Sequence, residues 1–175
     1  GALKAGARQS IPTGLGGSVS HHKYKLQKSR DQALEIGVAA VKHARALGCP
    51  DVEYFTEDSG RADPEYLYRV IEAVIKAGAT VINVPDTTGY MSPDEYGALF
   101  AGILNHVPGS ENVILSAHCH NYLGMATANA FAAFQAGTPQ VECTISGIGQ
   151  RSWNTTLEEV AMALPTRLAV SKLPT

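Results

Sequence analysis

The residues of this sequence whose type and spacing most directly suggest a chemical function are two histidines, His118 and His120. They end an apolar, partly β-branched run over residues 113–121. Successive side chains of a β-strand point to opposite faces, so residues two apart share a face. We therefore expect both imidazoles to project from one side of a strand end, where they could chelate one divalent metal ion. The alternative is a pair of ordinary polar residues, hydrogen-bonded to neighbours at the end of a strand.

Three further strands are predicted around this run, at 52–56, 80–84 and 140–146. In each strand one alternation is apolar and the other is partly polar, with the polar residues increasing toward the strand end. The polar sets comprise Glu53 and Glu57, Asn83 and Thr87, Ser116, His118 and His120, and Glu142, Thr144 and Ser146. The apolar alternation, such as Leu115, Ala117 and Cys119, is expected to face helices.

Helix signals recur between these strands. Capping sequences stand at 29–32, 63–64, 92–95 and 155–158, and glycines that end helices stand at 48, 78, 109 and 137. The predicted helices run from about 30 to 47, 64 to 77, 93 to 108, 123 to 136, and from 155 to just before Pro165. Strands and helices that alternate with a period of about thirty residues indicate βα units and a parallel sheet.

The polar alternation distinguishes between two parallel architectures. An open doubly wound sheet is covered by helices on both faces and has nearly continuous apolar strands. One apolar face and one polar face instead indicate a barrel with its chemistry at the carboxyl ends of the strands. We predict an α/β fold that is a partial TIM (β/α)8 barrel of about four to five βα units. Either the remaining units or another copy of the chain must cover the open sheet edges.

The N-terminal segment, residues 1–28, matches this pattern poorly. Its glycine-rich stretch at 10–18 includes Pro12, and both residue types weaken a strand. A phosphate-binding loop is the functional alternative, but the stretch lacks the Lys-Ser/Thr of a P-loop and the full GxGxxG pattern. We therefore divide the chain into this segment and a barrel portion over residues 29–175.

Composition excludes several classes of protein. The 175 residues are 45% hydrophobic and 17% charged, with a net charge of −2, which favours a single well-buried domain. This balance gives no reason to expect nucleic acid or an anionic membrane as a partner. No apolar run approaches a bilayer span and no signal peptide is visible. Three widely spaced cysteines indicate a soluble protein of a reducing compartment, in the cytoplasm, plastid stroma or mitochondrial matrix.

Two motifs carry a family resemblance. His-Cys-His-Asn at 118–121 and Gly-Ile-Gly-Gln-Arg-Ser-Trp-Asn at 147–154 resemble segments of the 2-isopropylmalate synthase family, which includes homocitrate and methylthioalkylmalate synthases. The likeness covers residues 22–163 and includes Glu-Asp-Ser-Gly-Arg at 57–61 and Asn-Val-Pro-Asp-Thr at 83–87. It implies that this chain corresponds to the C-terminal half of the catalytic barrel.

The resemblance implies an enzyme that forms a C–C bond by a metal-dependent Claisen condensation. Acetyl-CoA would condense with a 2-keto acid, 2-ketoisovalerate being favoured, in leucine biosynthesis. Homocitrate and methylthioalkylmalate synthases are alternatives within the same chemistry. A catalytically impaired barrel fragment that binds metal or associates with other subunits is the alternative outside it.

The resemblance also implies roles for individual residues. His118 and His120 would bind a divalent metal (Mn, Zn or Mg), with Asn154 beside it. Glu57 would be the catalytic carboxylate that orients groups or relays a proton, and Thr87 would contact the carboxylate of the keto acid. Arg61 would either pair with Glu57 or reach a substrate carboxylate. The Asp ligand of the family and its adjacent Arg belong to a first barrel strand upstream of these residues.

Four residues depart from the family pattern, and all are expected at the mouth of the barrel. Gln150 and Trp153 replace the usual Glu and Gly, and Tyr122 replaces an Asp. Pro12 stands where many members have a His. The departures place a bulky indole and a phenol beside the predicted metal site.

Overall fold

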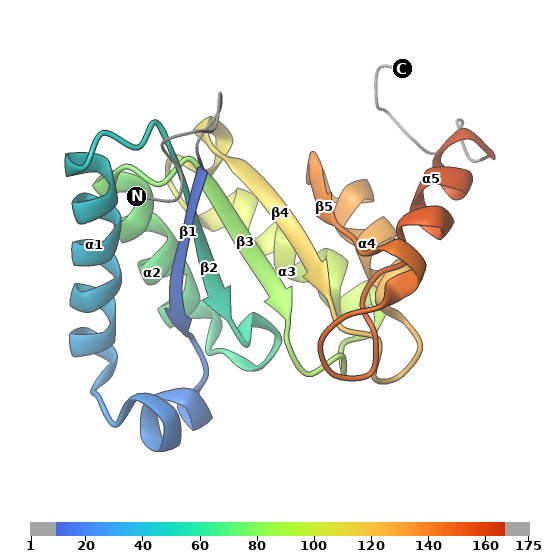
Figure 1. The fold of residues 1–175 in the computed structure, drawn as a ribbon. Coiled ribbons are helices and arrows are strands. Elements are labelled where there is room, and N and C mark those ends of the chain that lie inside the picture. Colours follow the sequence, from blue (N-terminus) through green and yellow to red (C-terminus); the bar gives the residue numbers. More distant parts are fainter. Residues whose placement is uncertain (1–9, 167–175) are drawn as a thin grey trace.

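The computed structural model describes residues 10–166, which form a single twisted parallel sheet and the helices that connect its strands (Figure 1). The five strands lie side by side in the order in which they occur in the chain, and every neighbouring pair is parallel. They are β1 (Ser10–Gly16), β2 (Asp51–Glu57), β3 (Val81–Asp86), β4 (Ile114–Cys119) and β5 (Gln140–Glu142).

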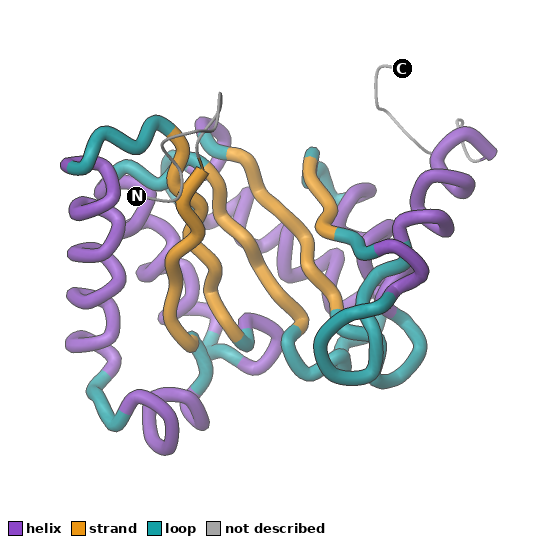
Figure 2. The backbone as a smooth tube through the Cα atoms, viewed as in Figure 1, coloured by secondary structure: helices purple, strands orange, loops and turns teal. Residues whose placement is uncertain are grey.

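One long helix follows each strand (Figure 2). The helices are α1 (Arg30–Ala46), α2 (Pro64–Ala77), α3 (Pro93–His106), α4 (Ala126–Gln135) and α5 (Leu157–Thr166). Short elements lie in the connections: η2, a π-helix at His21–Leu26, and the 3₁₀ turns η3 (Ser59–Arg61), η4 (Ser110–Asn112) and η5 (Ile145–Gly147). No helix of the described part is long and apolar enough to cross a membrane.

The starts of α1, α2 and α3 confirm three of the predicted capping sequences. Ser29 and Ser92 form reciprocal capping boxes with Gln32 and Glu95. Asp63 accepts a hydrogen bond from the Tyr66 amide at the start of α2. The four predicted helix-ending glycines all have positive φ, from 82° to 110°, a region that residues with a Cβ seldom adopt.

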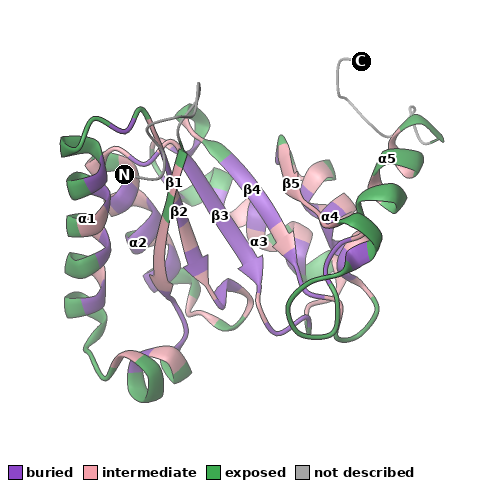
Figure 3. Ribbon diagram, viewed as in Figure 1, coloured by how far each residue is buried: buried purple, intermediate pink, exposed green. Residues whose placement is uncertain are grey.

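The hydrophobic core lies between the sheet and the helices on one of its faces (Figure 3). Strand β2 shows the division: Val52, Tyr54 and Thr56 are buried, whereas the residues that alternate with them are partly exposed. Leu115 and Ala117 of β4 face the core in the same way. Helices on one face, with parallel strands in chain order, confirm the partial barrel and exclude a doubly wound sheet.

Three predicted boundaries are wrong. Residues 10–16 form a full strand, β1, which pairs with β2 and makes the fifth βα unit. Strand β5 ends at Glu142 and not at Ser146, because the chain turns at η5, where Ser146 has a φ of 55°. Helix α5 contains Pro165 and does not stop before it. A proline so near the end of a helix removes only one of its last hydrogen bonds.

Candidate functional site

The uncovered face of the sheet forms a groove of about 460 Å³. Its floor consists of the inward-facing side chains of β2, β3, β4 and β5, and Lys25 of η2 and Gln150 lie at its rim. Most of the polar alternation predicted from the sequence therefore lines one groove, whereas Ser116, Thr144 and Ser146 are not among its lining residues. The groove contains His118, His120, Glu57 and Thr87 of the predicted site residues.

His118 and His120 lie side by side at the carboxyl end of β4. Their ring centroids are 5.1 Å apart, with the ring planes at 82° to each other. The strand alternation explains this placement: the intervening Cys119 is buried on the helical face, where burial raises the pKa of its thiol to about 12. The thiol is therefore a core group and not a nucleophile.

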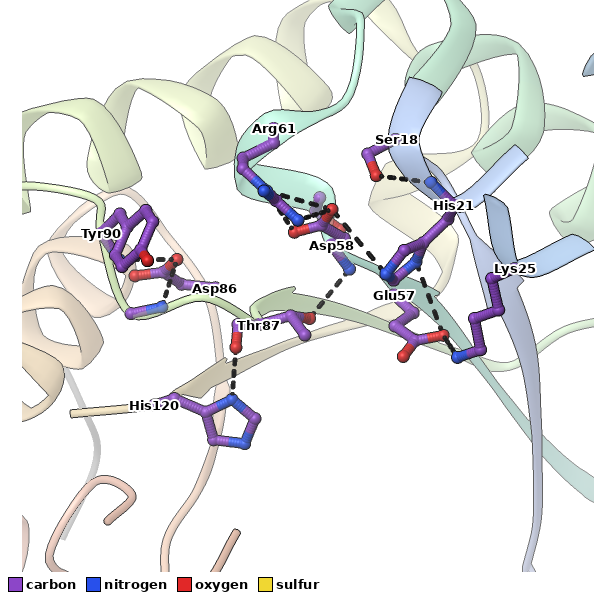
Figure 4. Close-up of polar contacts among 12 residues, drawn as sticks. Ser18, His21, Lys25, Glu57, Asp58, Arg61, Asp86, Thr87, Tyr90 and His120 are labelled. Carbon is purple, nitrogen blue, oxygen red and sulfur yellow. Dashed lines mark hydrogen bonds and ion pairs between the residues drawn. The ribbon is translucent and has the colours of Figure 1, made fainter. Parts of the chain in front are cut away.

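Each imidazole is held by an acceptor at Nδ1. His118 Nδ1 lies 2.9 Å from a carboxylate oxygen of Glu142, and His120 Nδ1 lies 2.7 Å from the backbone carbonyl of Thr87 (Figure 4 shows the second contact). Because a carboxylate and a carbonyl only accept, both Nδ1 atoms must carry the proton. In the neutral ring, a proton on Nδ1 leaves the lone pair of Nε2 available, which is the form in which histidine binds metal.

The electrostatics of His120 support the same protonation state. Burial lowers the pKa of this imidazole, a contribution that outweighs the hydrogen bond to the Thr87 carbonyl, which raises it. The neighbouring His118 lowers the pKa further. The neutral form of His120 therefore persists to lower pH than in a free imidazole.

Asn154, the third predicted metal ligand, lies beside the histidine pair because its backbone pairs with His120. This pairing is an antiparallel bridge, and the Asn154 side chain is buried. Its Oδ1 atom has no hydrogen-bond partner within the described residues. No three His, Cys, Asp or Glu side chains between residues 10 and 166 form a metal-binding group. The groove thus fits a divalent ion in part, with two imidazoles, and the predicted ligand Asn154 is not among the residues that line it.

Glu142 joins the histidine pair to a polar cluster on the groove floor. It accepts hydrogen bonds from Ser116 and from the Asn83 amide, which also donates to Glu53. Burial would raise the pKa of Glu142, but the bonds from His118, Ser116 and Asn83 hold it below its usual value. Burial raises the pKa of Glu53. Of the two carboxyls, Glu142 therefore loses its proton at the lower pH.

Glu57 and Arg61 differ in their surroundings. Glu57 lies in the groove, where it accepts a hydrogen bond of 2.5 Å from Lys25 and lies 3.7 Å from His21. Arg61 does not pair with Glu57: it binds the fully buried Asp58 at 2.7 Å, because η3 turns it toward that carboxylate (Figure 4). Of the residues lining the groove, the lysine, and not the predicted arginine, is the cation.

Thr87 is fixed at both of its polar groups. Its hydroxyl oxygen accepts the backbone N–H of Asp58 at 2.8 Å, and its carbonyl accepts His120. The hydroxyl proton is therefore free of this bond and can be donated to a ligand in the groove. Thr87 is the link between the β2 end of the site and the histidine pair (Figure 4).

The four departures from the family pattern lie around this site. Trp153 and Arg151 have φ values of 76° and 59°, in the left-handed region that favours glycine. Tyr122 is exposed and packs edge-on against Tyr90, with ring centroids 5.4 Å apart. Gln150 lines the groove, and Pro12 sits on the edge strand opposite Glu53.

The sequence interpretation missed Lys25 and the partnership of Glu142 with His118. The signal for Glu142 was its inward alternation in β5, which the sequence analysis noted without assigning a partner. Sheet register supplies the partner, since His118 and Glu142 are paired residues of neighbouring strands. Lys25 gave no such signal, because it lies in the irregular helix η2 and in none of the strands.

Comparisons with known proteins agree with this fold. The HMGL-like family model matches residues 1–175. A 2-isopropylmalate synthase of Parabacteroides distasonis is 56% identical over 161 residues, which are 92% of this chain and 32% of that protein. The chain thus spans about a third of the length of such curated relatives.

Solved structures show the same fold at much lower identity. The hydroxymethylglutaryl-CoA lyase of Pseudomonas aeruginosa superimposes with a TM-score of 0.77 at 20% identity, covering 90% of this chain and 55% of that one. An HMG-CoA lyase of Acinetobacter baumannii, in complex with coenzyme A and 3-methylmalate, gives 0.75 at 17% identity, covering 92% and 55%. The structural likenesses show the fold, and the family model over residues 1–175 establishes that the chain belongs to the HMGL-like family, in which its curated relatives are 2-isopropylmalate synthases.

Proposed function

We propose that this chain forms part of a metal-dependent acyltransferase that condenses acetyl-CoA with a 2-keto acid, 2-ketoisovalerate being favoured, as in leucine biosynthesis. The observation that carries the proposal is the pair of imidazoles at the end of β4. Both line one groove, and both are held at Nδ1, so that two Nε2 lone pairs are presented at the same surface. Family membership supports the acyl-transfer chemistry.

A divalent ion, when bound, would act as a Lewis acid that polarises a substrate carbonyl and as a template that orients it. His118, His120 and Asn154 would hold it, with the remaining ligands from outside the described residues. Glu142 and the Thr87 carbonyl fix the two rings. Their role is to keep both Nε2 atoms unprotonated and both rings oriented before the ion binds, which reduces the entropy lost on binding.

Thr87 and Glu57 have complementary roles in this proposal. The Thr87 hydroxyl donates to the carboxylate of the keto acid, because its oxygen is already occupied by the Asp58 amide. Glu57 accepts a proton from the reacting methyl group or orients the group that does so. Lys25 holds the Glu57 carboxylate at the rim of the groove in the absence of substrate.

Two alternatives remain within this framework. A homocitrate or methylthioalkylmalate synthase would use the same site with a different keto acid. A catalytically impaired barrel portion, which binds metal or associates with other subunits, would keep the histidines without turnover. The second alternative draws support from Trp153, whose indole occupies a left-handed position where the resembling family has glycine.

We also propose that the barrel portion, extended from the predicted residues 29–175 to include β1, corresponds to the C-terminal half of a catalytic barrel and acts with a missing half-barrel or a second copy of the chain. The exposed edges of β1 and β5 support this, and so does the length of the relatives.

Turnover is the direct test of the proposed function. The protein is incubated with acetyl-CoA, Mn²⁺ and a panel of 2-keto acids, and release of free CoA thiol is followed. We expect thiol release with 2-ketoisovalerate, loss of activity in His118→Ala and His120→Ala, and retention in His43→Ala, an exposed histidine of α1. Metal binding without thiol release for any keto acid would support the impaired alternative.

A further inference from the structure

We infer that Asp86 is a positioning residue that sets the orientation and tautomer of His120 through the loop that follows β3. The inference deepens the proposed function, because it concerns one of the two proposed metal-binding imidazoles. The inference rests on a series of contacts that leads from the Asp86 carboxylate through Thr87 to the ring of His120 (Figure 4).

The Asp86 side chain is fully buried and saturated with donors. One carboxylate oxygen accepts the backbone N–H groups of Gly89 and Tyr90, at 3.1 and 3.3 Å. The other accepts the N–H of Met91 at 3.1 Å and lies 3.5 Å from the Asn129 amide. A carboxylate that gathers three successive backbone amides fixes the path of that loop.

The same loop carries the group that holds His120. Thr87 directly follows Asp86, and its carbonyl accepts the Nδ1–H of His120 at 2.7 Å. The Asp86 carbonyl in turn accepts the backbone N–H of His120 at 3.3 Å. The ring and the backbone N–H of His120 are therefore both hydrogen-bonded to a segment whose shape depends on the Asp86 carboxylate.

His118 provides an internal comparison, because its Nδ1 is held by Glu142 of β5 and by nothing in this loop. Disturbing Asp86 should therefore change His120 and spare His118. General loosening of the fold would change both rings alike. Comparing the responses of His118 and His120 therefore distinguishes a positioning role of Asp86 from a general structural role.

The experiment reads the tautomer of each ring by long-range ¹H–¹⁵N correlation in the chain labelled with ¹⁵N-histidine, without metal or substrate. The spectra are recorded at about pH 8.5, two units above the usual imidazole pKa of about 6.5. In the native protein we expect a protonated Nδ1 and a bare Nε2 on both histidines. Failure of the proposed turnover would not affect this measurement.

Asp86→Asn is the main variant, because it keeps the shape but turns one acceptor into a donor facing backbone N–H groups. We expect His120 to shift toward a mixture with the Nε2–H tautomer, while His118 keeps its native signals. Glu142→Ala is the mirror control and should change His118 alone. An unchanged His120, or equal changes in both rings, would overturn the inference.

Asn129→Ala decides the matter if Asp86→Asn does not fold. It removes the amide that donates to Met91 at 2.8 Å and approaches Asp86, and it leaves the three backbone donors in place. A smaller shift of the same kind, confined to His120, supports the role of Asp86. A His120 spectrum identical to that of the native protein would overturn it.

Discussion

At the scale of single residues, the two imidazoles of β4 have different acceptors. His118 is held by a charged side chain from the neighbouring strand, and His120 by a backbone carbonyl. A carboxylate raises the basicity of a ligating histidine more than a carbonyl does, so His118 should depend more strongly on its partner.

Replacing Glu142 should therefore weaken metal binding without abolishing it. We expect Glu142→Gln to lower the affinity for Mn²⁺ by about tenfold to a hundredfold, as is typical when the partner of a ligating histidine is changed. Calorimetric titration measures the change. Glu35→Gln, at an exposed carboxyl of α1, is the control and should bind like the native protein. Native affinity in the Glu142 variant would show that the contact has no role in binding.

Strand alternation alone was sufficient to predict the histidine pair, because His118 lies in β4 and His120 directly follows the last residue of that strand. The partners of the pair come from other strands, and their identity depends on register and loop shape. Arg61 illustrates the limit: its neighbour Asp58 adopts a φ of 66°, and this local geometry directs the guanidinium away from Glu57. No pattern in the sequence indicates that backbone conformation.

At the scale of elements, the helix caps contribute stability that depends on pH. The Tyr66 amide lowers the pKa of Asp63, and the Ser92 amide lowers the pKa of Glu95. Since both folded pKa values lie below the unfolded ones, this stability is present above about pH 4 and is lost as the pH falls through the folded values.

The double variant Asp63→Asn, Glu95→Gln should thus be less sensitive to acid. We expect its urea midpoint to fall less between about pH 6 and pH 3 than that of the native chain, because amides do not titrate. Glu35→Gln again serves as the control. A fall as large as in the native chain would show that the caps do not contribute to acid sensitivity.

Helix α3 depends on a large aromatic contact with the core. Phe100 is fully buried and packs edge-on against Tyr96, with ring centroids 5.1 Å apart. Phe100→Ala should lower the free energy of unfolding by about 3–5 kcal/mol. Leu104→Ala, at a partly exposed position of the same helix, should cost less than half as much. Denaturant titration compares the two, and equal losses would contradict this assignment of the core.

The elements that the sequence predicted best are those with local signals. Capping boxes and helix-ending glycines are short-range features, and the structure confirms them. Strand β1 was weak in sequence because Pro12 and its glycines lack strand propensity, yet pairing with β2 over seven residues stabilises it. The short β5 shows the opposite effect, since the turn at η5 overrides a favourable strand sequence.

At the scale of the whole molecule, five parallel strands form an open arc. Its polar concave face and its two outer strands are the surfaces that a complete barrel covers. Strand alternation predicted this arc. The number of strands was less certain, because β1 had to be recognised from a segment of proline and glycines.

The isolated chain should therefore associate or be weakly stable. We expect sedimentation to show oligomers that grow with concentration, and a melting temperature that rises with concentration if association is specific. The physical reason is that no strand within residues 10–166 covers the outer edges of β1 and β5. A monodisperse monomer that unfolds cooperatively would contradict the half-barrel proposal.

Metal titration of the histidine variants tests the central claim most directly. Calorimetry with Mn²⁺, Zn²⁺ and Mg²⁺ is carried out on the native protein, on His118→Ala and His120→Ala, and on the exposed control His43→Ala. We expect binding of at least one ion by the native protein and the control, and its loss in both variants of β4. Unchanged affinity in His118→Ala and His120→Ala would contradict the assignment of this groove as a metal centre.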